Sequence, residues 1–98
     1  MTKKDLFNAK NSAHKMEKDL MITVVDCDSF KDVTKDGIEV DVSVLKSENG
    51  EMFSSISKTV HQSLSMLKEI LEEDEKVDVM VRESKSANGR DFLHLEIA

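Results

Sequence analysis

The sequence predicts a mainly β domain whose elements follow the order β-β-β-α-β-β. Three observations predict this order. Residues 19–57 contain three stretches with strand character, residues 60–71 carry apolar side chains at helical spacing, and residues 77–97 contain two further alternating stretches joined by Asn88-Gly89. A chain of 98 residues supports one core, so all six elements belong to a single fold.

The first predicted strand begins near Asp19. The run from residue 20 to 25 is rich in β-branched side chains and has no helical spacing, which indicates a strand buried on much of both faces. Residues 26–37 are rich in turn formers and end in Asp36-Gly37, a pair that favours a hairpin. We therefore expect this strand to end near Phe30.

The second and third predicted strands form a hairpin. In the second strand, apolar side chains alternate with mostly polar ones, which predicts that the even positions face the core: Ile38, Val40, Val42 and Val44. The chain turns at Asn49-Gly50 and returns through residues 52–57. Phe53 is out of phase with the apolar row of this third strand, so we expect its ring to face outward.

The predicted helix runs from about Val60 to Leu71. Its apolar positions recur at spacings of four, three and four residues, which is typical of an amphipathic helix. Thr59 and Gln62 have the spacing of a capping box at its start. The carboxylate run at residues 72–75 is unfavourable at the negative end of a helix dipole and predicts that the helix stops there.

The last two predicted strands alternate over their whole length. Both rows of apolar side chains are expected to face the core: Val77, Val79, Val81, Leu93, Leu95 and Ile97. Phe92 is out of phase with its row, as Phe53 is, and is predicted to face outward.

Residues 1–18 differ in charge from the rest of the chain. They hold five lysines against Asp5 and Glu17, a net charge of +3, so the remaining 80 residues carry −9 of the total of −6. Their few apolar positions predict a flexible or short-helical arm, either a nucleic-acid tether or a disordered leader. The expected organisation is an arm at residues 1–18 and one domain at residues 19–98.

Five antiparallel strands with one helix between the third and fourth resemble the OB-fold, in which the sheet curls into a barrel and the helix covers an open end. The resemblance covers residues 19–98 and extends to the small single-stranded-DNA-binding proteins of phages and plasmids. The first strand lacks the central glycine that often lets it bend around such a barrel. An open α+β sheet with the helix on one face is the alternative.

The resemblance implies binding of single-stranded nucleic acid, most simply DNA, on strands two and three and on two flanking loops, between strands one and two and between strands four and five. There, phenyl rings would stack on bases and cations would contact phosphates. The candidate residues in these places are Phe30, Lys31, Lys35, Lys46, Phe53, Lys58, Arg82, Lys85, Arg90 and Phe92. Glu39 and Asp41 lie on the same expected face and would repel phosphates.

Other kinds of site are not indicated by the sequence. The single cysteine, Cys27, permits no internal disulfide and suggests a reducing, cytoplasmic environment. No apolar stretch is long enough to span a membrane. The aspartates of residues 26–36 do not fit a calcium loop, the three histidines and Cys27 are too scattered for zinc, and no nucleotide-binding or nucleophile motif occurs. We expect no catalytic residue, no metal and no cofactor.

Three functions remain open. The first is a non-catalytic single-stranded-DNA-binding module of a phage or plasmid. The second is an acidic protein-binding module, such as a phage-type inhibitor or DNA mimic, whose carboxylates occupy a basic groove on a host protein. The third is a subunit of a homo-oligomer that pairs through the strand at residues 93–97.

Overall fold

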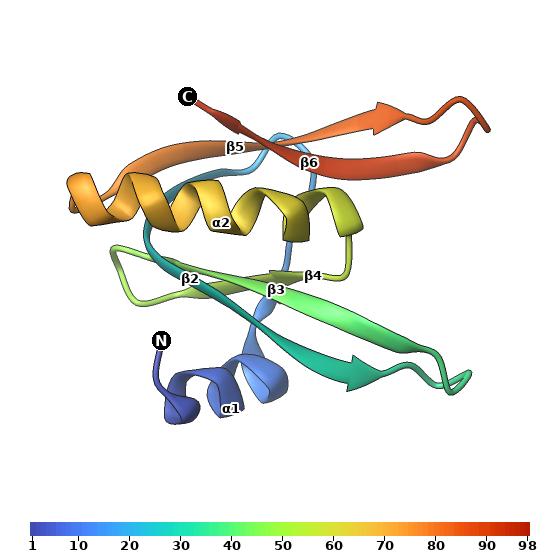
Figure 1. The fold of residues 1–98 in the computed structure, drawn as a ribbon, viewed down its shortest axis with the longest axis horizontal. Coiled ribbons are helices and arrows are strands. Elements are labelled where there is room, and N and C mark those ends of the chain that lie inside the picture. Colours follow the sequence, from blue (N-terminus) through green and yellow to red (C-terminus); the bar gives the residue numbers. More distant parts are fainter.

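The computed structural model describes all residues, 1–98, as one curled sheet of six strands with two helices (Figure 1). The helices are α1 (Lys3–Ser12) and α2 (Lys58–Glu73), and the strands are β1 (His14–Lys15), β2 (Met21–Val33), β3 (Glu39–Ser47), β4 (Met52–Ser55), β5 (Val77–Lys85) and β6 (Asp91–Ile97). The strand order is β1-β4-β3-β2-β5-β6, and only β1 and β4 are parallel. The predicted mainly β class is confirmed. Neither helix is long and apolar enough to cross a membrane.

Strand β2 is longer than predicted and belongs to both halves of the sheet. Its first residues pair with β5, and the rest pair with β3 as far as Val33, which lies opposite Glu39. The prediction that this strand ends near Phe30 is therefore wrong, because ladder pairing with β3 outweighs the turn propensity of its aspartates. The register shifts between Val24 and Asp26, and this bulge bends the strand where a glycine was expected.

Helix α2 lies inside the curl of the sheet and supplies one side of the main core (Figure 1). The core consists of Met16, Ile22, Val24, Cys27, Leu45, Val60, Leu64, Leu67, Val79 and Val81. The helix begins at Lys58, and its cap is Ser57, not Thr59: the Ser57 hydroxyl accepts from the amide of Val60 at 3.4 Å and donates to the carbonyl of Leu93 at 2.7 Å. The helix also continues two residues beyond Leu71.

The expected closed barrel of five strands is open between β4 and β6. Instead, β1 occupies the free edge of β4, with Lys15 opposite Ser54. The chain then crosses to the other half of the sheet, where the amide of Asp19 donates to the carbonyl of Val81 at 2.7 Å. Strand β1 and this crossing segment, residues 16–20, thus connect the edge of β4 to β5. The order of the five longer strands is still that of an OB-like fold.

The first 18 residues are ordered against the sheet. Thr2 and Asp5 form the capping box of α1, so the short-helix form of the predicted arm is the one observed. Ala9 is buried against Val42 and Val44, and Met16, only 2% exposed, belongs to the main core. Alternate residues of a strand point to opposite faces, and Leu45 meets the main core beside α2, so α1 covers the other face of β3.

Both faces of β3 are thus covered, which reverses part of the predicted pattern. Val42 and Val44 face α1, while Leu45 and its register partner Phe53 pack on the main core. The prediction that Phe53 faces outward is wrong, because the α1 face of the sheet was not recognised from the sequence. The inward rows of β5 and β6 are as predicted except for Ile97, which is exposed. As the last strand of the sheet, β6 has a free edge, and homo-oligomer pairing there stays a prediction.

Candidate nucleic-acid interface

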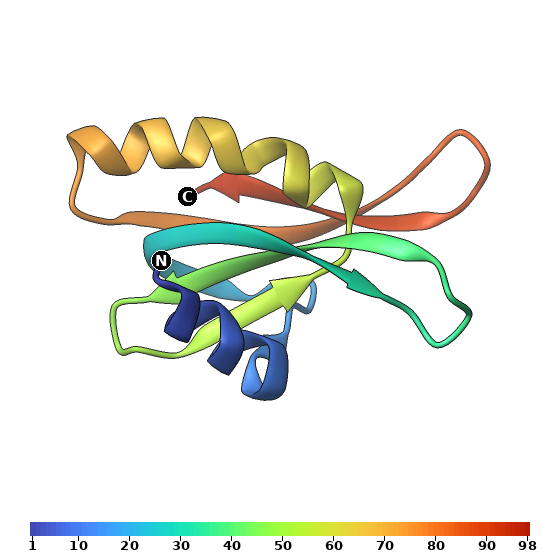
Figure 2. The same cartoon turned by 60° about the horizontal axis from the view of Figure 1, so that its bottom comes forward.

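Two hairpins extend from the same end of the molecule, beyond the start of α2 (Figure 2). One consists of β2 and β3 and turns at residues 34–37, and the other consists of β5 and β6 and turns at residues 86–89. Gly37 and Gly89 have φ values of +79° and +75°, a conformation that side chains disfavour and that closes both turns. The hairpins correspond to the two loops that the OB-fold resemblance places beside the ligand.

A groove of about 880 Å³ lies between the two halves of the sheet at this end. One side is the connection from β4 to α2, residues 54–59, and the other is the start of β6 with its turn. Ala13, Lys15 and Met16 line it from the N-terminal segment. The groove therefore lies where β4 and β6 fail to pair.

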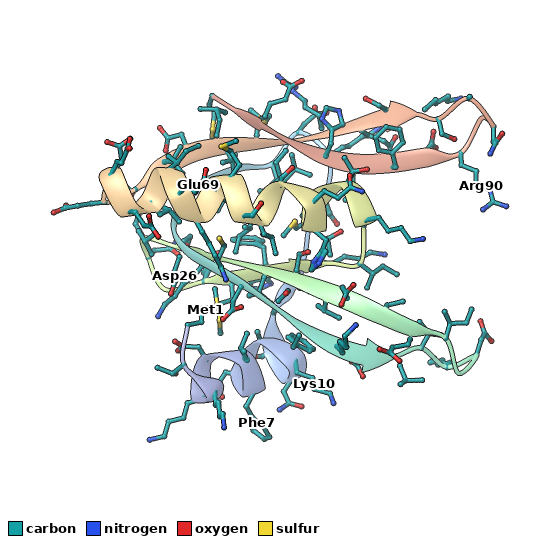
Figure 3. All side chains as sticks on the ribbon, in the orientation of Figure 1. Met1, Phe7, Lys10, Asp26, Glu69 and Arg90 are labelled. Carbon is teal, nitrogen blue, oxygen red and sulfur yellow. The ribbon has the colours of Figure 1, made fainter.

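Three of the cations without a carboxylate partner line this groove, and two more lie on the hairpins at the same end of the molecule. Seven of the 14 lysines and arginines have no carboxylate oxygen within 4.0 Å: Lys3, Lys4, Lys15, Lys35, Lys58, Lys85 and Arg90. Lys15, Lys58 and Arg90 line the groove, while Lys35 is in one hairpin turn and Lys85 is at the base of the other. Arg90 points from its hairpin toward the gap (Figure 3). A groove lined by unneutralised cations attracts a polyanion even when the whole protein is acidic.

One phenyl ring lies on the groove. Phe92 is half-buried, lines the wall formed by β6, and lies 5.9 Å from the ring of His94, centroid to centroid. The His94 ring is held by a 2.8 Å hydrogen bond with Ser84. The neighbouring Ile56, which is exposed, adds an apolar side chain to the opposite wall. Together they offer contact area for bases beside the cations.

Three predicted cations are engaged elsewhere. Lys31 lies 3.3 Å from Glu39 and 3.4 Å from Asp41, and these hydrogen bonds raise the pKa of Lys31. Lys46 pairs with Asp5 of α1 at 3.9 Å. Arg82 lies 3.2 Å from Asp19 and 3.3 Å from Glu96. The acidic side chains of β3 that were expected to repel phosphates thus already have a partner in Lys31.

The structure divides the ten predicted site residues into groups. Lys58, Arg90 and Phe92 line the groove, and Lys35 and Lys85 lie on the two hairpins that extend from the same end of the molecule. Phe30 packs in the small cluster under α1, and Phe53 packs on the main core beside the ring of His14. Lys15 also lines the groove but was not among the predicted residues, because only the pairing of β1 with β4 brings it there.

A run of unpaired carboxylates lies at the other end of the molecule. Glu69, Glu72, Glu73, Asp74 and Glu75, at the end of α2, have no cation within 4.0 Å. Glu69 and Arg90 lie toward opposite ends of the molecule (Figure 3). Asp91 is the one carboxylate that lines the groove, against Lys15, Lys58 and Arg90, so the local charge is opposite in sign to that of the whole protein.

Neither a reactive thiol nor a metal cluster is present in the structure. Cys27 is buried in the main core, and burial raises the pKa of its thiol to about 11, so it is protonated at neutral pH. No three His, Cys, Asp or Glu side chains are grouped in a way that could hold a metal ion.

A family model for phage single-stranded DNA-binding protein matches residues 2–98. The chain belongs to this family. The match includes the N-terminal segment as well as residues 19–98, and it agrees with the curled OB-like sheet and with the predicted resemblance to phage proteins of this kind. Membership of this family supports single-stranded DNA as the partner of this protein. Comparison with curated proteins and with solved structures gives no match.

Proposed function

We propose that this protein is a non-catalytic single-stranded-DNA-binding protein of a phage or plasmid and that the strand lies in the groove between the two hairpins. The observation that carries the proposal is the distribution of unpaired cations: three line the groove, and two more lie on the hairpins at the same end. Family membership supports the nature of the ligand.

The groove offers two kinds of contact to a single strand, cations for phosphates and a phenyl ring for bases. Lys15, Lys58 and Arg90 contact phosphates, and each phosphate contact releases counterions and makes binding weaker at high salt. Phe92 stacks on a base, a contact worth about 1–3 kcal/mol. None of these contacts reads the edge of a base, so binding tolerates most sequences, as coating a single strand requires.

Affinity for an oligo(dT) of about 16 nucleotides, measured over a salt series, tests the proposal. Replacing two groove cations, Lys58→Gln with Arg90→Gln, should weaken binding and reduce the slope of log K against log salt by about 1.4, since each phosphate contact with a single strand contributes about 0.7. The matched control is Lys68→Gln with Lys76→Gln, which removes the same charge from cations that already pair with Asp28 and Glu48.

A second variant separates stacking from charge. Phe92→Leu keeps an apolar side chain but removes the aromatic face, and it should weaken binding by about 1–3 kcal/mol without changing the salt slope. Equal losses of affinity in the groove double variant and in the control double variant would show that only total charge matters, and they would contradict the assignment of the groove as the binding site. Absence of binding by the unaltered protein at low salt would sink the function itself.

A further inference from the structure

The outer face of α1 carries the most exposed large apolar side chain in the protein. Phe7 is 67% exposed and points away from the sheet (Figure 3), whereas Ala9 on the opposite side of the helix is buried. Isolated exposed apolar residues are ordinary. Phe7 differs from them in its neighbours: Lys3 and Lys4 precede it by four and three residues, the spacings at which helix side chains lie side by side. Together with Asn8, these three side chains line a shallow hollow.

This face is cationic because its lysines are not neutralised. Lys3 and Lys4 are exposed and have no carboxylate within 4.0 Å. Asp5, the one acidic residue of α1, accepts a hydrogen bond from the amide of Thr2 at 3.1 Å and faces Lys46 at 3.9 Å. These contacts lower the pKa of Asp5, the bond from Thr2 most of all. The Asp5 carboxylate therefore interacts with the helix start and with Lys46 of the sheet, and it does not neutralise Lys3 or Lys4.

The cationic face continues the proposed groove. Ala13 and Lys15, which follow α1 directly in the chain, line the groove. Lys10 lies at the end of α1 that leads toward them, and Phe7 is less than one turn further along the helix (Figure 3). A strand that leaves the groove past Lys15 therefore meets the last turn of α1, then Phe7 and the lysine pair.

We propose that the outer face of α1 is a second contact surface for the same single strand of DNA, in which Phe7 stacks on a base and Lys3 and Lys4 contact phosphates. The proposal rests on the proposed function of the groove. Charge complementarity selects the ligand, because α1 presents cations and a phenyl ring on a protein whose remaining residues are strongly acidic.

The test compares two lengths of oligo(dT), about 5 and about 16 nucleotides, close to the limits of what one OB-fold covers. The shorter one fills the groove only, and the longer one also reaches α1. Phe7→Ala should weaken binding of the longer oligonucleotide between about five-fold and a hundred-fold and leave the shorter one unchanged. Lys3→Gln with Lys4→Gln should reduce the salt slope for the longer one by about 1.4.

Matched controls come from α2 and from paired cations. Met66→Ala removes an apolar side chain of similar exposure, 61%, from the surface of the other helix, and it should change neither affinity. Lys68→Gln with Lys76→Gln again controls for total charge. Ultraviolet crosslinking to an iodouridine-substituted 16-mer adds a direct readout: the crosslink should fall on the tryptic peptide that contains Phe7, residues 5–10.

The outcomes separate the two proposals. If groove variants lose both oligonucleotides while the α1 variants match their controls, the α1 surface is overturned and the groove stands. If Phe7→Ala changes the molecular mass in sedimentation but not the DNA affinity, α1 is a contact between copies, which also overturns the proposal. If the unaltered protein binds neither oligonucleotide, the proposed function itself fails.

Discussion

The two helices of this protein are attached to the same sheet in different ways. α2 has 16 residues and buries Val60, Leu64 and Leu67 in the main core. α1 has ten residues, buries only Ala9, and adds ion pairs from Lys10 to Asp32 and from Asp5 to Lys46. Apolar burial stabilises far more than exposed ion pairs do. The difference indicates that α2 stabilises the fold, whereas α1 presents a charged surface on it.

The largest expected effect tests the structural role of α2. Leu64→Ala removes a side chain that is 5% exposed and leaves a cavity under the helix. We expect it to lower the free energy of unfolding by about 2–5 kcal/mol, as measured by urea denaturation. A loss below about 1 kcal/mol would mean that α2 packs loosely and would remove the contrast with α1.

A smaller effect depends on pH and on the thiol beneath α2. The Sγ atom of Cys27 lies 3.8 Å from the carbonyl oxygen of Leu64, and burial raises the pKa of the thiol to about 11. In the unfolded chain its pKa is about 8.5. Above that pH the unfolded state loses the proton and the folded state keeps it, so stability falls as pH rises.

Between pH 8.5 and 10 this fall should be on the order of 1–2 kcal/mol. Cys27→Ala should lack it, while every other titrating group contributes equally to both proteins. Urea denaturation of the two proteins at both pH values measures the difference. If the stability of the two proteins fell equally with pH, the Cys27 site would accommodate the thiolate and would be more open to solvent than the structure indicates.

The smallest expected effect compares the two helix caps. Thr2→Ala removes the α1 capping box, and a cap of this kind contributes about 1 kcal/mol to its helix. Since α1 contributes little to the core, we expect faster amide exchange in α1 only. Ser57→Ala removes the α2 cap and the bond to Leu93, so it should lower the protection of the whole core. Equal effects of the two variants would contradict the separation of roles.

The sequence predicted α2 and the longer strands because their apolar rows are long and regular. It did not predict how α1 packs, since the inward side of that helix carries small residues such as Ala9 while its largest apolar residue, Phe7, faces solvent. The same omission made the prediction for β3 and β4 wrong. Without α1 covering one face of the sheet, the valines of β3 were expected to face the main core and Phe53 was expected to face solvent.

The site was predictable where a residue's place follows from the order of the elements. Lys58 at the start of the helix and Arg90 and Phe92 in the last hairpin follow from that order. Lys15 does not, because it reaches the groove through pairing between β1 and β4, which are far apart in the chain. Nor could the sequence show which cations are neutralised: Lys31 and Lys35 look alike, but only Lys31 lies between two carboxylates.

The backbone joins the two walls of the groove at two places. Strand β2 is shared by both halves of the sheet, and residues 16–20 connect the edge of β4 to β5 at Val81. The spacing of the walls is therefore set when the chain folds. The groove is therefore pre-organised, and if it binds DNA as proposed, the entropic cost of ordering the complex falls mainly on the flexible polyanion and little on the protein.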